Sequence, residues 1–388
     1  MEKEKRVRIF RRVMGGPVGL FLRLKLNAVW DPLPALSGGV LIVSNHNTDY
    51  DPLIIASATE RSIHFVATEG IKRIPVAGWL ADRFCWIILH YKGRAGISTV
   101  RAMLSALKAG NPVMVFPEGN RSFNGITGAF EPSIAKVAKK AGTPLATYRI
   151  EGGYLTSPRW GSGVRKGKMR ARLVNLYSPE QLSAMSESEV RDAIAADIYE
   201  DAYAAQREKR IEYKGRRRAE GIESTLFLCP GCGAMGTMHG RGDRLECQCG
   251  FGAFYDNFGY IVSDAGEKYT VTGLDSKNHE YIRSLPAGKD SEEVLFRDTV
   301  EVHSVNNDHT AGERKTVQLS ATPAGLRIGK LRLGFGEISG LAIQGRNRMQ
   351  VTYEAADGPQ LVEINGPASF SALKYLYLYN NYREGAVN

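Results

Sequence analysis

The sequence predicts an α/β protein: a layered sheet with helices, followed by a cysteine-rich ribbon and a small β-rich module. Three observations carry this prediction. Short apolar runs alternate with helical patterns from about residue 39 to 174, four of the five cysteines gather in one short window, and short alternating strands follow over residues 292–363. Strands that alternate with helices are typical of a sheet covered by helices, with side chains for function in the loops at strand ends.

Length, composition and charge narrow the classes of protein that the chain can be. Its 388 residues suffice for two or three domains, and 43% hydrophobic with 24% charged residues is typical of globular proteins. Lysine and arginine number 51 against 41 acidic residues, so the net charge of +10 suits an anionic partner such as nucleic acid, anionic lipid or a phosphorylated substrate. The best apolar candidate, residues 18–30, contains Arg23 and Lys25, which argues against a membrane-spanning helix but not against a helix that lies on a membrane. The first twelve residues are highly charged and show no secretory signal.

For residues 1–30 the sequence predicts basic amphipathic helices. Basic and apolar residues recur there at helical spacing, and Gly15, Gly16 and Pro17 predict a break between two helices. Such helices can lie in a lipid interface with their cations toward anionic headgroups. Packing of the pair on the protein's own core is the alternative that the sequence leaves open.

For residues 31–215 the sequence predicts the domain with the layered sheet. Expected strands cover residues 40–43, 64–67, 86–90, 113–116 and 145–150. Expected helices begin at residue 51, cover 98–109 and 131–141, and end with one long charged helix over 186–218. The basic run that closes this helix leads into an expected linker over residues 216–225.

The first loop with candidate chemistry follows the strand at residues 40–43. His46 would lie at the rim of the sheet, and the carboxylate of Asp51, five residues later, can fold back to one ring nitrogen. Such a contact fixes the histidine tautomer and makes the other nitrogen a better general base. The alternative is that Asp51 only caps the next helix while His46 is a turn residue, and Asp49 is a second carboxylate that competes for the role.

The second loop, residues 116–122, follows the strand at 113–116. It contains Glu118, Gly119 and Arg121, and a planar guanidinium beside exposed backbone N–H groups suits phosphate oxygens. The alternative is a structural turn in which Arg121 pairs with Glu118.

Together, the two loops resemble those of the glycerolipid acyltransferase family, which includes the 1-acyl-glycerol-3-phosphate acyltransferases. The Asn-His-x4-Asp block matches at His46 and Asp51, and the Phe-Pro-Glu-Gly-x-Arg-Ser block matches at residues 116–122, with Asn120 where threonine is usual. The resemblance covers residues 30–175. It implies an acyltransferase-type α/β fold and transfer of a fatty acyl group from acyl-CoA or acyl-carrier protein to the hydroxyl of a lysophospholipid.

The resemblance also implies roles for single residues. His46 would be the general base and Asp51 its orienting partner, while Glu118, Gly119 and Arg121 would bind the substrate, with the arginine at the acceptor's phosphate. The family's middle block carries an arginine whose place falls at Tyr91 here, so that Lys92 or Arg94 would supply the charge.

The cysteine window predicts a structural zinc site in residues 226–258. Cys229 and Cys232 form one pair, and Cys247 and Cys249 form the second pair after fourteen intervening residues, as in a zinc ribbon. The second pair has one spacer residue where two are usual, and His239 is an alternative ligand. Four thiolates leave no open position for catalysis, and reduced cysteines indicate a reducing compartment. Residues 259–388 predict a β-rich domain that resembles pleckstrin-homology-like domains.

The sequence therefore favours a phospholipid-synthesis acyltransferase, peripheral on the cytoplasmic face of an anionic membrane. Two alternatives remain: a catalytically inactive lipid-binding adaptor and a zinc-ribbon nucleic-acid-binding protein. Binding of nucleic acid is disfavoured because aromatic and basic residues do not interleave in the ribbon.

Overall fold

The computed structural model of the chain describes residues 2–68, 70–71, 75–90, 96–130, 132–286, 292–305, 311–356 and 358–387. The chain forms two compact units. The first contains residues 1–91, 95–159 and 163–215, and the second contains residues 92–94, 160–162 and 216–388. Each unit is described by itself.

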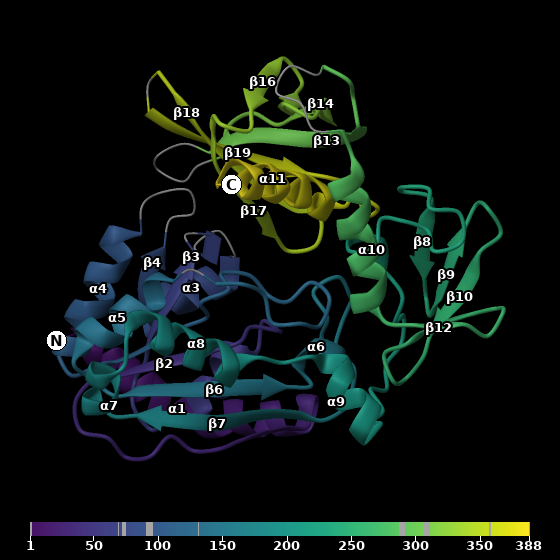
Figure 1. The fold of residues 1–388 in the computed structure, drawn as a ribbon. Coiled ribbons are helices and arrows are strands. Elements are labelled where there is room, and N and C mark those ends of the chain that lie inside the picture. Colours follow the sequence, from purple (N-terminus) through teal and green to yellow (C-terminus); the bar gives the residue numbers. More distant parts are fainter. Residues whose placement is uncertain are drawn as a thin grey trace. The chain divides into compact units, whose positions relative to one another are not determined.

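The first unit is a sheet with helices on both faces (Figure 1). Its strands are β1 (Ala28–Trp30), β2 (Val40–Ser44), β3 (His64–Thr68), β4 (Trp86–His90), β5 (Pro112–Val115), β6 (Leu145–Glu151) and β7 (Met169–Tyr177), in the order β1-β7-β6-β2-β5-β3-β4. Only the β6–β7 pair is antiparallel. Its helices are α1 (Glu2–Leu26), α2 (Asp51–Ser57), α3 (Pro75–Phe84), α4 (Ile97–Lys108), α5 (Ser133–Ala141), α6 (Gly153–Thr156), α7 (Pro179–Ala184), α8 (Glu187–Ile198) and α9 (Ala202–Lys209). The α/β architecture expected for the first part of the chain is therefore confirmed.

Strand β2 shows why this sheet is covered on both sides. Its residues are all buried, and their side chains alternate between two hydrophobic clusters. Leu41 and Val43 pack with residues of α4, α5 and α8, whereas Val40 and Ile42 pack with residues of α1 and α2. A parallel strand with both faces buried is an uninterrupted apolar run, which explains why the sequence revealed it.

Two expected elements differ from the structure. Residues 2–26 form one helix with Pro17 inside it, not two helices. The helix is held on both sides of Pro17, because the Arg11 guanidinium binds backbone carbonyls of Thr59 and Arg61 while Leu22 and Leu26 are fully buried in the core. These contacts outweigh the hydrogen bond that proline removes. The expected helix over 186–218 is instead α8 and α9, separated at residues 199–201.

The break between α8 and α9 has a local cause. The Asp201 side chain accepts hydrogen bonds from the backbone amides of Tyr203 and Ala204, so that it caps a new helix. Helix α9 ends at Lys209, and the C-cap residue Arg210 has a left-handed backbone conformation. Among the described residues, no helix is both long and apolar enough to cross a membrane.

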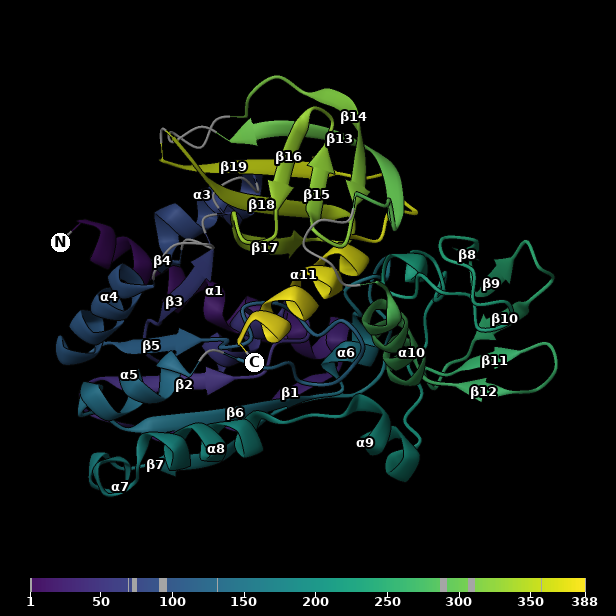
Figure 2. The same cartoon turned by 45° about the horizontal axis from the view of Figure 1, so that its top comes forward.

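The second unit contains two antiparallel sheets (Figure 2). The smaller consists of β8 (Met238–Arg241), β9 (Arg244–Cys247), β10 (Gly252–Tyr255), β11 (Ile261–Ser263) and β12 (Lys268–Tyr269), in the order β12-β11-β10-β9-β8. The larger, ordered β16-β15-β14-β13-β19-β18-β17, consists of β13 (Phe296–Val305), β14 (Lys315–Ala321), β15 (Gly325–Ile328), β16 (Leu331–Gly334), β17 (Ile338–Gln344), β18 (Arg348–Ala355) and β19 (Gly358–Asn365). Helices α10 (Val271–Ser284) and α11 (Ala372–Val387) and the short 3₁₀ helix η2 (Ile222–Ser224) complete the unit.

Residues 216–225, expected to be a linker, belong to this second unit. Ala219 and Ile222 are fully buried there, so the segment contributes to a core. Helix α11 closes the large sheet through Tyr375, whose hydroxyl donates to Asp298 of β13 at 2.6 Å. The larger sheet and its final helix agree with a β-rich module. Its resemblance to pleckstrin-homology-like domains stays a prediction.

Candidate active site

The two loops with candidate chemistry lie at the same edge of the first unit's sheet. Strands β2 and β5 are parallel neighbours, and each loop follows the carboxyl end of its strand. The backbone amide of Ser122 donates to the His46 carbonyl at 2.8 Å, and the His46 ring stacks on Phe116 with centroids 4.2 Å apart. The fold therefore brings the two loops into direct contact.

His46 and Asp51 form a hydrogen-bonded pair. Nδ1 of His46 lies 2.9 Å from Oδ2 of Asp51, whose side chain is fully buried, whereas the His46 side chain is 20% exposed. A carboxylate only accepts, so Nδ1 carries the proton and the lone pair is on Nε2. Asp51 is the first residue of α2, and the N-cap is Tyr50, which makes no side-chain cap. The Asp51 side chain thus serves the histidine loop and does not cap its helix.

Further donors hold the Asp51 carboxylate in place. The backbone amides of Asn47 and Thr48 donate to Oδ2 at 2.6 and 2.8 Å, and Oγ1 of Thr48 donates to Oδ1 at 2.6 Å. These contacts offset the cost of burying a carboxylate. They also fix the direction in which Asp51 faces His46.

Glu118 ties the histidine loop to the arginine loop. Its carboxyl oxygens accept hydrogen bonds from the backbone amides of His46 at 2.7 Å and Gly128 at 2.6 Å. Burial raises the pKa of Glu118 to about 8, against the opposing effect of these two amides. Gly119 has a left-handed φ of 65°, which favours glycine, and its amide donates to the Phe116 carbonyl at 3.2 Å. Both residues therefore shape the loop, and their contact with a substrate stays a prediction.

The other carboxylate of the first loop has a different partner. Nη1 of Arg121 lies 3.0 Å from Oδ2 of Asp49, so Asp49 pairs with the arginine while Asp51 pairs with the histidine. Arg121 is 13% exposed and Asp49 is 78% exposed. The alternative of a turn in which Arg121 pairs with Glu118 does not hold, because Arg121 pairs with Asp49 instead. Lys92 and Arg94 lie outside the described residues.

Glu200 is a residue of the site that the sequence did not indicate. It follows α8, and its carboxyl accepts from the Nδ2 atoms of Asn47 at 2.5 Å and Asn45 at 3.3 Å, and from the Gly152 amide at 2.7 Å. Burial raises the pKa of Glu200 to about 8. Glu200 thus holds both asparagines that flank His46. Those two asparagines, directly after a buried strand, were the one available signal, because buried amides require partners.

Arg159 is a second residue that the sequence did not indicate. It follows α6 and is 7% exposed. Its guanidinium carbon lies 4.5 Å from the centre of the Phe123 ring, and Nη1 lies 3.5 Å from Oδ1 of Asn120. A buried cation is thereby placed beside the arginine loop.

In the second unit, four cysteines form a separate cluster. The sulfurs of Cys229, Cys232, Cys247 and Cys249 all lie within 4.8 Å of one another. Two separations, 3.7 Å for Cys229–Cys249 and 3.9 Å for Cys232–Cys247, match the edge of about 3.8 Å expected for a tetrahedron with Zn–S bonds of about 2.3 Å. The cluster therefore fits a tetrahedral metal ion, and His239 is not part of it.

The sheet, the histidine–carboxylate pair and the adjoining arginine loop define a class of proteins, the glycerolipid acyltransferases. The family model described as Acyltransferase matches residues 28–151, so this part of the chain is similar to that family.

Individual relatives match over limited lengths. The 1-acyl-sn-glycerol-3-phosphate acyltransferase BAT2, chloroplastic, of Brassica napus is 29% identical over 133 residues, which are 34% of this chain and 38% of that protein. A probable 1-acyl-sn-glycerol-3-phosphate acyltransferase of Mycoplasma pneumoniae is 28% identical over 148 residues, 35% of this chain and 53% of that protein. The crystal structure of the 1-acyl-sn-glycerophosphate acyltransferase PlsC from Thermotoga maritima covers 53% of this chain and 79% of that chain at 22% identity. Its TM-score of 0.41 is too low to establish a common fold.

Proposed function

We propose that the protein transfers a fatty acyl group from acyl-CoA or acyl-carrier protein to the free hydroxyl of a lysophospholipid, 1-acyl-glycerol-3-phosphate in the first instance. The observation that carries the proposal is the His46–Asp51 pair at the carboxyl end of β2, in contact with the loop that contains Arg121. The names of the relatives that match residues of the first unit support the same acceptor.

The chemistry needs one base and no enzyme nucleophile. Nε2 of His46 takes the proton of the acceptor hydroxyl as its oxygen attacks the thioester carbonyl, and the Asp51 carboxylate stabilises the imidazolium. The C–S bond then breaks, and the leaving thiolate takes the proton from the imidazolium. The products are the diacylated lipid and the free thiol.

Ser122 carries a hydroxyl group in the arginine loop (residues 116–122), but this hydroxyl is not arranged as a nucleophile. Its Oγ donates to the Ile126 carbonyl at 2.7 Å and accepts from the Gly125 amide at 2.9 Å. These bonds use the hydroxyl to close the loop. The acceptor's own hydroxyl therefore takes the part that serine plays in hydrolases.

Acyl transfer by purified full-length protein tests the proposal. Labelled acyl-CoA and acyl-carrier protein are offered with a panel of lysophospholipids. His46→Ala should lower turnover by about 10²–10⁴. His64→Ala is the matched control, because His64 begins β3 at the opposite end of the parallel strands, and it should retain activity. Transfer by His46→Ala at the wild-type rate would refute the mechanism, and binding of lysolipid without any transfer would favour the adaptor.

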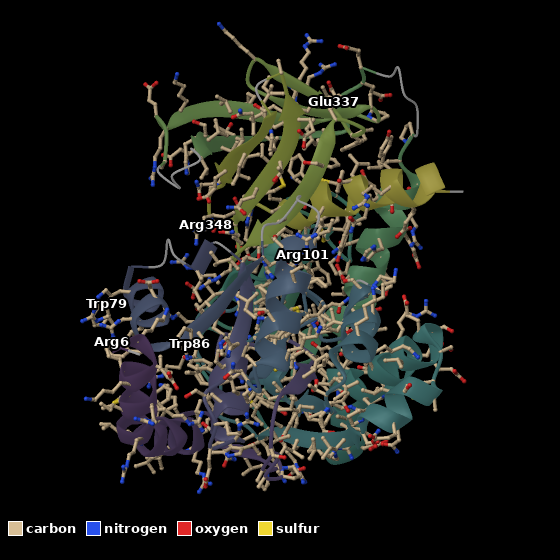
Figure 3. The ribbon with its side chains drawn as sticks, turned by 90° about the vertical axis from the view of Figure 1, so that its left-hand side faces the viewer. Arg6, Trp79, Trp86, Arg101, Glu337 and Arg348 are labelled. Atoms are coloured by element: carbon tan, nitrogen blue, oxygen red, sulfur yellow. The ribbon has the colours of Figure 1, made fainter. Side chains whose placement is uncertain are left out.

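A membrane surface is the proposed place of action. Helix α1 buries one apolar face, with Val7, Leu22 and Leu26, yet a second set of its apolar residues is exposed: Ile9, Val13, Leu20, Phe21 and Leu24. Trp79 of α3 is 60% exposed and lies at the outer edge of the first unit (Figure 3).

Such an exposed apolar face, flanked by basic residues, suits the interface of an anionic bilayer. Exposed arginines and lysines of α1 supply the charge: Lys5, Arg8, Arg12, Arg23 and Lys25. We propose that the protein acts at the cytoplasmic face of such a membrane.

We propose that the cysteine cluster binds a structural zinc ion. Cys229, Cys232, Cys247 and Cys249 would hold it as thiolates, and the ion would stabilise the small sheet β8–β12. Donors to the sulfurs support this assignment: the Gly231 amide lies 3.3 Å from the Cys229 sulfur. Four protein ligands leave the ion no part in acyl transfer.

A further inference from the structure

Glu200 connects the histidine loop to the segment that follows the arginine loop. Its side chain accepts hydrogen bonds from Asn45 and Asn47, which flank His46. Its backbone pairs with Thr127, because the Glu200 amide donates to Oγ1 of Thr127 at 2.9 Å and the Thr127 amide donates to the Glu200 carbonyl at 3.0 Å. Glu200 thus fastens both sides of the proposed active site, although it lies outside the matched residues 28–151.

Neighbouring contacts fix the orientation of both asparagine side chains. Oδ1 of Asn45 accepts from the Ile150 amide at 2.7 Å, and Nδ2 of Asn45 donates to the Ile150 carbonyl at 2.9 Å. Nδ2 of Asn47 donates to the same carbonyl at 3.0 Å. A reversed amide would bring its oxygen against that carbonyl oxygen. Both asparagines therefore present N–H groups to Glu200.

Within the part of the chain that the structure describes, the Glu200 carboxyl group meets N–H donors only. Oε2 accepts from Nδ2 of Asn47 at 2.5 Å and of Asn45 at 3.3 Å, and Oε1 accepts from the Gly152 amide at 2.7 Å. A carboxylate accepts all three bonds, whereas a protonated carboxyl group would turn its O–H toward one of these donors. The arrangement therefore fits the ionised form.

Burial opposes this ionisation. It raises the pKa of Glu200 to about 8, the carboxylates of Glu151 and Asp51 raise it as well, and the donors lower it. Burial, followed by the charge of Glu200, raises the pKa of the Tyr213 hydroxyl, which therefore stays neutral near pH 8. Burial also raises the pKa of Glu118, in the arginine loop, to about 8. Glu200 thus changes its charge near neutral pH, and any test must allow for Glu118.

We propose that Glu200, as a carboxylate, is a positioning residue for acyl transfer. In that form it holds the histidine loop so that Nε2 of His46 reaches the acceptor hydroxyl. Glu200 touches no substrate in this role, which rests on the proposed function. Protonation of Glu200 would place a donor against a donor and loosen the loop, and a displacement of about 1 Å at a reacting group can lower a rate by about 10²-fold.

The test compares kcat of the wild type and of Glu200→Gln across the pH range of this ionisation. Glutamine keeps the size of the side chain and lacks the charge, so it imitates the protonated form. The ratio of wild-type to variant kcat should grow from about 1–3 at about pH 6 to about 10–100 at about pH 9, with the KM of both substrates unchanged. Glu118 titrates in both proteins and does not affect the ratio. A ratio that is the same at every pH would overturn the proposal, because it would show a purely structural role.

Asp197→Asn is the matched control. Asp197 is also buried, three positions before Glu200, and it accepts three hydrogen bonds at 2.8 Å. Their donors, Thr147, Asn175 and Tyr177, lie on β6 and β7 and not on the histidine loop. Asp197→Asn should lower the melting temperature as Glu200→Gln does, yet its kcat ratio to the wild type should not change with pH. A pH-dependent loss as large as that of Glu200→Gln would overturn the proposal.

Asn47→Ala keeps the test decisive if Glu200→Gln does not fold. It removes the nearest donor to Glu200 and leaves the carboxylate in place. We expect a fall in kcat of about 10-fold at about pH 9, without a change in KM. Wild-type turnover by folded Asn47→Ala would overturn the proposal.

Nuclear magnetic resonance of protein labelled with ¹⁵N-histidine reports the same role without turnover. The signal of the proton on Nδ1 of His46, which donates to Asp51, is identified by its absence in His46→Ala. At the high end of the pH range this signal should persist in the wild type and in Asp197→Asn and be lost in Glu200→Gln. An unchanged signal in Glu200→Gln would overturn the role of Glu200. Absence of acyl transfer by the wild type would instead overturn the proposed function, so the two failures are distinguishable.

Discussion

Replacing Asp51 with asparagine would remove one charge from the proposed active site and leave its shape unchanged. The backbone amides of Asn47 and Thr48 both point at Oδ2, so the oxygen of the new side chain must occupy that position. The amide nitrogen then replaces Oδ1, where Oγ1 of Thr48 can accept a hydrogen bond instead of donating one. Nδ1 of His46 still donates to an oxygen, and the variant keeps the tautomer while losing the charge.

The size of the effect follows from the geometry. An imidazolium and a carboxylate 2.9 Å apart attract each other by about 6 kcal/mol at an effective dielectric constant of about 20, and by about 1.4 kcal/mol in water. Because His46 is partly exposed and Asp51 is fully buried, we expect an intermediate value of about 3 kcal/mol. That corresponds to a fall in kcat of roughly 10²-fold for Asp51→Asn.

Asp51→Ala provides the comparison. It also leaves the amides of Asn47 and Thr48 without this acceptor, and each buried donor left unpaired costs about 1–3 kcal/mol of folding stability. Initial rates at saturating acyl donor and acceptor, together with urea unfolding of both variants, measure the two effects. Wild-type rates from Asp51→Asn would show that the charge has no role. A loss of kcat in Asp51→Asn that is far deeper than about 10²-fold would show that the tautomer is not preserved.

Three further predictions concern stability, metal and membrane. The pKa values of Glu118 and Glu200 are each raised to about 8 from an ordinary 4.5. Between these two pH values the folded protein therefore keeps a proton on each carboxyl group that the unfolded chain has lost. The free energy of unfolding should therefore fall between about pH 4.5 and 8, by up to about 1.4 kcal/mol per pH unit for each group, and Glu200→Gln should remove one group's share in urea unfolding curves. Elemental analysis should find about one zinc per chain, lost in Cys229→Ser together with protease resistance near residues 226–258; wild-type protein without metal would contradict this. Leu24→Ser on α1 should weaken sedimentation of the protein with anionic vesicles about 3–10-fold, because an exposed apolar side chain is lost, whereas Leu176→Ser on β7 should not. Equal binding by the wild type and both variants would exclude α1 as the docking element.

Five of the seven strands of the first unit, β2 to β6, could be predicted because short apolar runs mark them, whereas β1 and β7 were not predicted. Val40 to Val43 are apolar without interruption, and the same holds for residues 86–89 of β4 and for β5. The continuity of α1 could not be predicted. The contacts of Arg11 with Thr59 and Arg61 join residues about fifty positions apart, and local propensity at Pro17 contains no information about them.

The same division applies to the candidate site. His46 and Asp51 lie five residues apart, so a turn at a strand end was enough to predict their contact. Glu200 reaches Asn45 and Asn47 from more than 150 positions away, and its charge resembled that of any solvent-exposed helix residue. Arg159 was missed for the same reason, since only the folded chain places it beside Asn120.

The pairing of β1 with β7 limits how the chain can be divided for expression. The matched family segment ends at residue 151, yet β1 pairs with β7, at residues 169–171, and β7 also covers the open edge of β6. A fragment of residues 28–151 would begin with a detached strand, expose the hydrogen-bonding edge of β6 and lack Glu200. Unpaired strand edges promote aggregation. A fragment of the first unit that folds by itself must therefore extend past Glu200. That is well beyond residue 151, where the match to the family model ends.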